Sequence, residues 1–303
     1  MSPSVLDWLV EGDPAIRWQT ERDLLGDPSW KATRSRVAHE GWGRRLLDEQ
    51  DPEGTWGGGL YQPKWTSTVY TLLLLRRMGL DASNERAITG SRRLLDDADW
   101  VDGGVSYWRH RPEAERCVNG MVLSVVASFD VADPRVDSIA DLLTRTRMED
   151  GGWNCQDQRG ATHSSFHTTI SVLEGLLSWK QRTGRSDADD ALASGGEVLL
   201  SHRMFRSHRT GHVIDERWLT PHFPPRWHYD VLRGLDHLRD AEGRPDPRAS
   251  EAIDRLAALR RSDGRWSKGP QYSGLTFFPL EPGRVPGRWT TLRALRVLRW
   301  WNA

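Results

Sequence analysis

The chain has 303 residues, 37% of them hydrophobic, which is enough for one large core or two small domains. Its 42 basic and 42 acidic residues cancel, so bulk charge gives no reason to expect nucleic acid or an anionic membrane as a partner. No apolar run approaches the ~20 residues of a membrane span, and the first residues lack a signal-peptide pattern. Two cysteines are too few for a disulfide framework. These features predict a cytoplasmic protein, and the preference for arginine over lysine indicates a bacterial one.

Six segments in chain order share a polar start that runs into a long apolar helical pattern. The starts fall near Trp18, Trp65, Cys117, His167, Trp227 and Trp289. More polar, amphipathic helical segments lie between them, at about 31–49, 85–96, 134–146, 189–203 and 248–260. Strand-like alternation is scarce, so residues 1–303 are predicted to be one all-α domain of six helical hairpins. The apolar helices favour an inner ring inside an outer ring, a closed toroid, over the competing open solenoid.

The loops between the segments contain glycine followed by an aromatic residue. Residues 50–56, "QDPEGTW", fit the Q-x-x-x-G-x-W part of the QW repeat of squalene and hopene cyclases, and "DGGW" and "DGRW" are looser copies. On these motifs the chain resembles the α/α toroids of the terpenoid cyclase and protein prenyltransferase superfamily. The resemblance implies an (α/α)6-type toroid. It also implies an aromatic-lined central cavity for an apolar, isoprenoid-like substrate, which the 16 tryptophans would suit.

Four of the six apolar segments start with a basic residue followed by tryptophan. These pairs are Arg17–Trp18, Lys64–Trp65, Arg226–Trp227 and Arg288–Trp289. Helix N-termini carry partial positive charge and unpaired N–H groups, so several of them at one mouth, together with these cations, would bind diphosphate or carboxylate. The eight residues are therefore the predicted substrate-binding residues. In the alternative interpretation, the cations pair with nearby acids and tie the ring together.

The other two starts carry Cys117 and His167 in place of tryptophan, and both are strong zinc ligands. Prenyltransferase β subunits place zinc on an Asp-x-Cys and on the His of a Phe/Tyr-His-Thr. The resemblance therefore implies Glu115, Cys117 and His167 as ligands, with Glu115 a departure from Asp. Cys155 and His163 are further candidates, because they come just before the helix that contains His167. Alternatively, the cysteines are core residues and His163 caps that helix.

The predicted function is a terpene cyclase or prenyltransferase-like enzyme with a zinc ion at one mouth of the ring. Prenyltransferases of this type need a second chain, so a partner subunit is allowed for. One alternative is a metal-free class II cyclase-like enzyme in which Asp230 is the acid, with His228 and Tyr229 beside it in "RWHYD". A second alternative is a non-catalytic toroid that binds a lipid or a protein.

Overall fold

The computed structural model describes residues 4–108, 110, 113–241, 243–283 and 286–303. Apart from one antiparallel pair, β1 (Asp99–Val101) and β2 (Gly104–Ser106), the regular elements in these ranges are helical. The prediction of an all-α chain is therefore confirmed. No helix in the described ranges is both long enough and apolar enough to cross a membrane.

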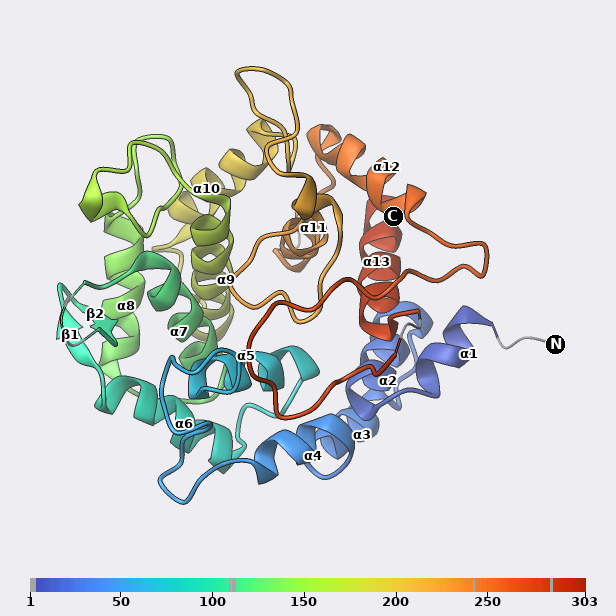
Figure 1. The fold of residues 1–303 in the computed structure, drawn as a ribbon, viewed down its shortest axis with the longest axis horizontal. Coiled ribbons are helices and arrows are strands. Elements are labelled where there is room, and N and C mark those ends of the chain that lie inside the picture. Colours follow the sequence, from blue (N-terminus) through green and yellow to red (C-terminus); the bar gives the residue numbers. More distant parts are fainter. Residues whose placement is uncertain (1–3, 109, 111–112, 242, 284–285) are drawn as a thin grey trace.

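The longer helices fall into two sets, one around the centre of the molecule and one outside it (Figure 1). The inner set is α2 (Pro14–Thr20), α5 (Thr68–Met78), α7 (Arg116–Ser128), α9 (Phe166–Thr183), α11 (Val231–Asp240) and α13 (Arg288–Trp301). The outer set is α1 (Val5–Val10), α3 (Trp30–Ser35), α4 (Gly41–Asp48), α6 (Glu85–Asp96), α8 (Pro134–Arg145), α10 (Asp189–Ser201) and α12 (Ser250–Ala258). Short π or 3-10 turns cover Glu21–Leu25, Arg36–Ala38, Asp157–Arg159, Glu216–Leu219 and Pro247–Ala249.

Neighbouring inner helices contact one another around the centre. Helix α7 packs against α5 and α9, α11 packs against α9 and α13, and α13 packs against α2. Helix α2 is joined to the end of α5, because the indole N–H of Trp18 donates to the Met78 carbonyl at 2.8 Å. Helices α2 and α13, which belong to opposite ends of the chain, thus lie side by side (Figure 1). Glycine allows the closest approach, since a methyl group on Gly175 of α9 would collide with the Gly120 carbonyl of α7.

Three tryptophans in the QW-like loops connect outer helices to inner helices. Each indole N–H donates to a carbonyl ten residues earlier, near the end of the preceding outer helix, at 2.7–2.8 Å. These bonds are Trp56 to Leu46, Trp153 to Leu143 and Trp266 to Leu256. Each backbone N–H of the same tryptophan donates to a threonine hydroxyl in the following inner helix, at 3.0–3.1 Å. The acceptors are Thr68, Thr169 and Thr291. All three side chains are fully buried, so these tryptophans are structural ties.

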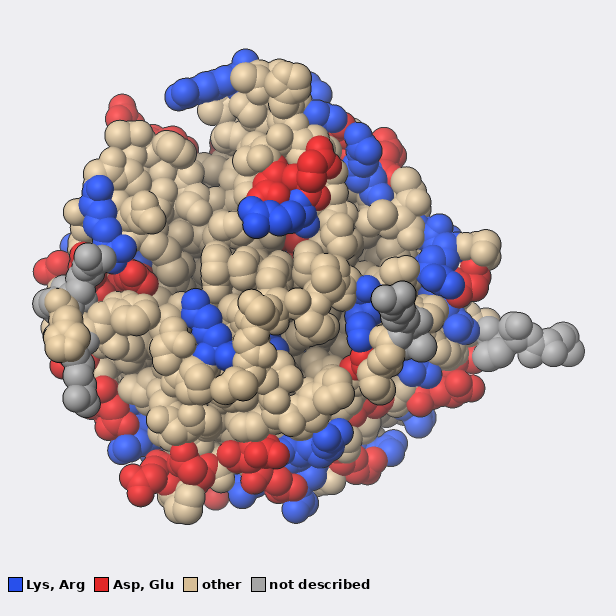
Figure 2. Space-filling view, viewed as in Figure 1, with Lys and Arg blue, Asp and Glu red and all other residues tan. Residues whose placement is uncertain are grey.

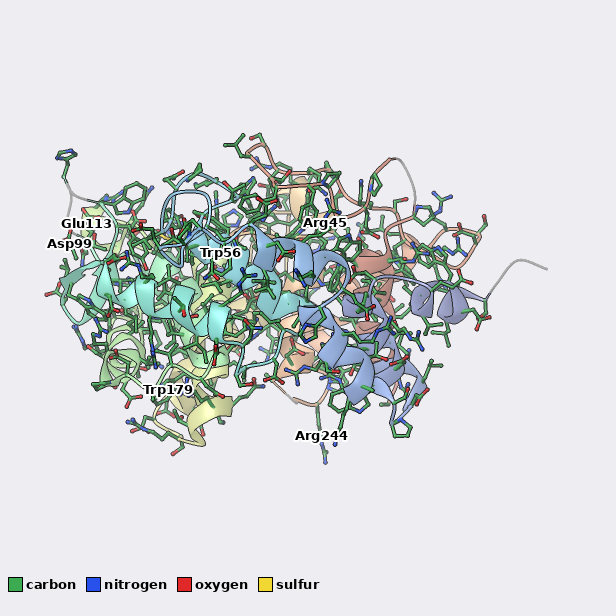
Figure 3. The ribbon with its side chains drawn as sticks, turned by 90° about the horizontal axis from the view of Figure 1, so that it is seen from below. Arg45, Trp56, Asp99, Glu113, Trp179 and Arg244 are labelled. Carbon is green, nitrogen blue, oxygen red and sulfur yellow. A yellow bond between two sulfur atoms is a disulfide. The ribbon has the colours of Figure 1, made fainter. Side chains whose placement is uncertain are left out.

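The inner set of helices has two ends, which we call its N-terminal mouth and its C-terminal mouth. At the N-terminal mouth α5, α7, α9, α11 and α13 begin, and the loop 267–283 crosses it. At the C-terminal mouth these helices end. In the side view, Arg45 and Trp56 lie toward the first mouth, and Trp179 and Arg244 lie toward the second (Figure 3). The face of the N-terminal mouth is mostly uncharged at its centre, with Lys, Arg, Asp and Glu mainly around the rim (Figure 2).

Replacing Trp153 by phenylalanine should lower the free energy of unfolding by about 2 kcal/mol, because the buried Leu143 carbonyl loses its donor and the smaller ring leaves a void. Trp300→Phe is the matched control, since it loses a similar bond to the Gly243 carbonyl at an exposed site where water replaces it. Urea denaturation of both variants measures the difference. Equal stabilities of the two variants would contradict the role of Trp153.

Candidate functional site

The N-terminal mouth is filled by aromatic side chains and by the loop above it. The indole N–H of Trp65 donates to the Ser273 carbonyl at 2.9 Å. The backbone N–H of Trp65 donates to the Leu275 carbonyl, and the backbone N–H of Leu275 donates to the Lys64 carbonyl. His228 is stacked between Trp227 and Tyr272, with ring centroids 3.7 and 3.8 Å away. Burial lowers the pKa of His228 to about 3, so this ring is neutral at pH 7.

Asp230 and Tyr229, the other two predicted catalytic residues, form hydrogen bonds that hold helix α11 in place. Asp230 is fully buried and caps α11, because its carboxylate oxygens accept the backbone N–H groups of Arg233 at 2.8 Å and His222 at 3.1 Å. The Tyr229 hydroxyl donates to the Met204 carbonyl at 2.6 Å. Burial raises the pKa of Tyr229 well above its ordinary value. These contacts hold α11 in place, and they leave no oxygen of Asp230 free of a hydrogen bond.

The predicted zinc ligands are not brought together as a ligand set. Cys117, in the first turn of α7, forms a disulfide with Cys155, in the loop before α9. The His167 ring accepts the Tyr229 backbone N–H at 2.8 Å, and burial lowers the pKa of His167 to about 4.

Glu115 accepts a hydrogen bond from Arg159 at 3.1 Å, and His163 is exposed. Within the described residues, no three His, Cys, Asp or Glu side chains are grouped as metal ligands. A disulfide leaves neither cysteine a thiolate for a metal. The prediction of zinc stays a prediction.

The predicted substrate-binding residues are divided between the two mouths. Trp18 is the fifth residue of α2, whereas Trp65 precedes α5 and Trp227 precedes α11. The tryptophans are therefore not equivalent positions of a repeat, which corrects the alignment made from the sequence. Trp18 and Trp289 line a cavity that extends from the C-terminal mouth along α13, of which Trp289 is the second residue.

The four predicted cations also have separate surroundings. Arg17 pairs with Glu21 at 2.6 Å. Arg288 lies over the ring of Trp8 at 4.5 Å. Lys64 and Arg226 lie beside the rings of the N-terminal mouth: Lys64 is 5.5 Å from the Trp227 centroid, and Arg226 is 5.3 Å from the Trp65 centroid. Arg17 therefore has the ion pair with a nearby acid that the alternative interpretation of these cations predicted.

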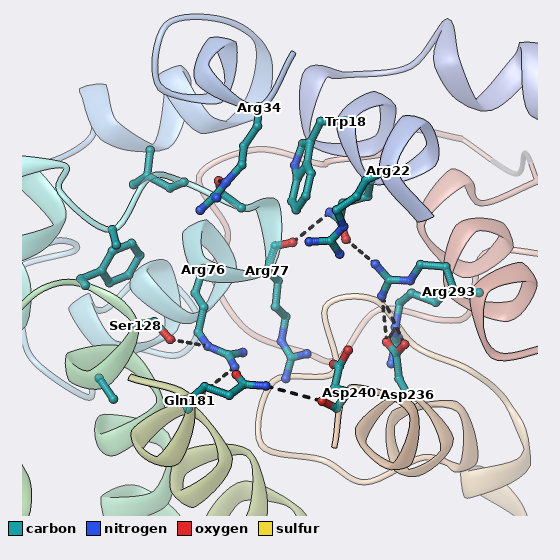
Figure 4. A pocket seen from close by; sticks show the side chains of 18 of the residues that line it. Trp18, Arg22, Arg34, Arg76, Arg77, Ser128, Gln181, Asp236, Asp240 and Arg293 are labelled. Atoms are coloured by element: carbon teal, nitrogen blue, oxygen red, sulfur yellow. Dashed lines mark hydrogen bonds and ion pairs between the residues drawn. The ribbon is translucent and has the colours of Figure 1, made fainter. Parts of the chain in front are cut away.

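The largest concentration of arginine lies around the cavity of about 560 Å³ at the C-terminal mouth (Figure 4). Its arginines are Arg22, Arg34, Arg76, Arg77, Arg182, Arg239, Arg293 and Arg296. Its acids are Asp130, Asp236 and Asp240, and its aromatic residues are Trp18, Phe129, Phe223 and Trp289. Cations therefore outnumber carboxylates in the lining, and part of the lining is apolar.

Arg76, like Arg34 and Arg182 of the same lining, forms hydrogen bonds to neutral groups. Its Nε donates to the Ser128 hydroxyl and its Nη2 to the Ser178 hydroxyl, both at 2.8 Å. Among the described residues it has no ion pair. Burial lowers the pKa of Arg76, but an arginine remains charged at pH 7. Two neutral hydroxyls thus orient this guanidinium in the cavity without cancelling its charge.

Asp236 holds three of the other arginines. Its carboxylate accepts from Arg293 at 2.9 Å, from Arg239 at 3.1 Å and from Arg296 at 3.2 Å. Burial raises the pKa of Asp236, but Arg296, Arg239 and Arg293 together lower it below its ordinary value. One carboxylate does not use all the donors, since Arg293 Nη2 and Arg296 Nε are buried without a partner among the described residues.

Glu174 lies deeper, between α9 and its neighbours. It accepts from Arg233 at 2.8 Å and from Arg77 at 2.9 Å. Burial raises the pKa of Glu174, but Arg233 and Arg77 lower it more, so it lies well below its ordinary value of 4.5. Glu174 is thus an ionised link between three inner helices.

The sequence reasoning did not find this arginine cluster. Its signal was arginine within or just after the last turns of apolar helices, as in "LLLLRRM" and "RVLRWW". Cations there are ordinary complements of the helix dipole, so the pattern does not by itself indicate a site.

Comparisons with known proteins add little. No protein-family model and no curated protein matches the chain. A solved structure, described as a crystal structure of a protein from Actinoplanes, is similar at 18% identity over 96% of this chain and 91% of that one, with a TM-score of 0.49. That similarity carries no argument about function. None of these findings bears on the resemblance to terpenoid cyclases and prenyltransferases.

Replacing Glu174 by glutamine should lower the free energy of unfolding by about 3–5 kcal/mol at pH 7, because two buried arginines lose their counter-charge. The pKa of Glu174 is lower in the folded state, so its contribution is full above pH 4.5 and is lost as the pH falls further. The difference in the free energy of unfolding between wild type and Glu174→Gln should therefore become smaller as the pH falls below 4.5.

Denaturation at several pH values measures this gap. Glu197→Gln is the control, because it breaks an exposed pair with Arg248 and should cost less than about 1 kcal/mol. A gap for Glu174→Gln that does not change with pH would contradict the assignment.

Proposed function

We propose that the described helices form an (α/α)6-type toroid whose C-terminal mouth binds an anionic small molecule. The observation that carries this proposal is Arg76, a guanidinium that two hydroxyls orient and that has no ion pair among the described residues, in a cavity where cations outnumber acids. The buried donors of Arg293 and Arg296 support it, because each lacks a partner that a ligand oxygen would supply. A cavity of about 560 Å³ is within the usual size range for small ligands.

The apolar part of the lining favours a ligand with two different ends. Trp18, Phe223 and Trp289 line the same cavity as the arginines, and the rings of Phe223 and Trp289 are stacked 4.1 Å apart. An isoprenoid diphosphate has both properties, since its diphosphate suits guanidinium groups and its chain suits aromatic surfaces. The isoprenoid-like ligand expected from the sequence is thus retained, but with its charged end at the opposite mouth from the one predicted.

The contacts of the acids favour binding over acid–base chemistry. Asp236 and Glu174 are both held by arginines as ionised groups, which leaves them poor proton donors. A terpene cyclase or prenyltransferase-like enzyme stays the second candidate. It is favoured by Asp240, a cavity residue that pairs with Arg239 at 2.6 Å but whose pKa is raised by burial, as a proton donor requires. In such an enzyme the arginines would stabilise the charge that develops on a leaving diphosphate.

The test is isothermal titration with geranyl diphosphate, geraniol and pyrophosphate. Wild type should bind the diphosphate ester more tightly than either fragment. Arg76→Gln should weaken binding of geranyl diphosphate by about tenfold, the value of one charge-assisted hydrogen bond. Arg44→Gln is the control, because Arg44 pairs with Asp48 on an exposed surface and should leave binding unchanged.

Equal affinity of wild type and Arg76→Gln, or no binding of any anion, would contradict the proposed site. Release of pyrophosphate from the bound ester would distinguish the enzyme from a binding protein.

A further inference from the structure

A second cavity lies at the other mouth, beneath the loop 267–283. It has a volume of about 150 Å³, and its lining includes Trp65, Leu74, Arg226, Tyr272 and Phe278. None of the residues that line it also lines the cavity at the C-terminal mouth. We refer to it as the loop cavity.

Arg226 is the unusual residue of the loop cavity. Its side chain is buried, with 9% exposure for the residue, yet its guanidinium has no hydrogen bond or ion pair with any part of the chain that the structure describes. The Cζ atom of its guanidinium lies over the Trp65 ring, 5.3 Å from the ring centroid. Burial lowers the pKa of Arg226 to about 10, so it is still a cation at pH 7. Burying a cation without an ion pair costs folding free energy, and an anion bound beside it would offset part of that cost.

The backbone adds a second cost at the same residue. Arg226 has a φ of +57°, a left-handed conformation that is uncommon outside glycine, asparagine and aspartate. Residues held in such conformations are concentrated at functional sites, because the surrounding structure must enforce them. The conformation presents the Arg226 side chain to the loop cavity.

The other charged groups of the loop cavity already have partners. Lys268 Nζ donates to the carbonyl oxygens of Glu281 and Gly283. The Glu281 carboxylate accepts the backbone N–H of Arg288 at 2.5 Å. Lys268 and Glu281 carry opposite charges in the same lining, so Arg226 leaves one positive charge in excess there, and one negative charge on a ligand would balance it.

The rest of the lining defines the uncharged part of the ligand. Trp65, Leu74, Phe277, Phe278 and Leu280 are apolar, and an apolar cavity of about 150 Å³ in another protein accommodates benzene. We propose that the loop cavity binds a small monocarboxylate with an aromatic or short aliphatic tail. Its carboxylate pairs with the guanidinium of Arg226, and its tail packs against the apolar walls. This site is independent of the proposed function, because it lies in a different cavity and uses different residues.

The test is titration of the full-length protein with benzoate, with benzyl alcohol as the uncharged analogue and inorganic phosphate as the anion without a tail. Benzoate should bind wild type and raise its melting temperature. Arg226→Gln should weaken benzoate binding by at least about tenfold. Arg45→Gln is the control, because Arg45 lies over the ring of Phe278, 3.7 Å from its centroid, but does not line the cavity. That variant should bind benzoate like wild type.

A structural role for Arg226 gives different results. Without ligand, Arg226→Gln should melt at the same temperature as wild type or higher, because it removes an unpaired buried charge. Arg226→Lys keeps the charge but not the two-pronged geometry, so its affinity should fall by less than that of Arg226→Gln. The proposal is overturned if wild type, Arg226→Gln and Arg226→Lys bind benzoate with equal affinity, or if wild type does not bind benzoate up to about 10 mM. It is also overturned if wild type binds phosphate more tightly than benzoate, or if Arg226→Gln alone loses much of its stability.

Discussion

The bond from a buried indole to the end of an outer helix is the constraint on which the packing of outer helices against inner helices depends. An indole N–H that is buried needs an acceptor, and Trp56, Trp153 and Trp266 find one at the same distance along the chain. The loops that deliver them contain glycine in the left-handed conformation, and Gly90 in the next outer helix leaves room for the Trp56 ring. Because the same tryptophans also bind the start of the inner helix, the outer helix, the loop and the inner helix form one unit.

That geometry determines where charge collects. Inner helices that begin at one mouth must end at the other, so their partial negative ends converge there. Positively charged arginines at these helix ends are stabilised by the negative partial charge. Arg77 is further neutralised by Glu174, and Arg293 and Arg296 are neutralised by Asp236. Such pairs account for the network without any ligand. Arg76 is different, because hydroxyl groups orient it and leave its charge uncancelled. The distinction between a structural and a binding role therefore depends on the partner of each arginine.

The sequence predicted the helical class and the alternation of helices, because apolar runs of helical period are long here and strand-like alternation is scarce. It also marked the QW-like loops, but it could not tell a structural tie from a cavity lining, since both use buried tryptophan. The alignment at Trp18 was wrong because α2 begins earlier, where Asp13 caps a helix that starts with Pro14. The disulfide was missed because Cys117 and Cys155 meet only after two separate elements are placed in space.

The candidate sites could not be predicted from local pattern, for a physical reason. An arginine in the last turn of a helix has the same sequence context whether it faces solvent, a carboxylate or a cavity. Only the folded structure brings arginines from four inner helices to one mouth, with more donors than Asp236 and Glu174 can accept. The donors left over are the part of the network that packing alone does not explain. A bound anion would complete them, and the ion pairs already present would hold the arginines in position before it arrives, which reduces the cost of ordering them on binding.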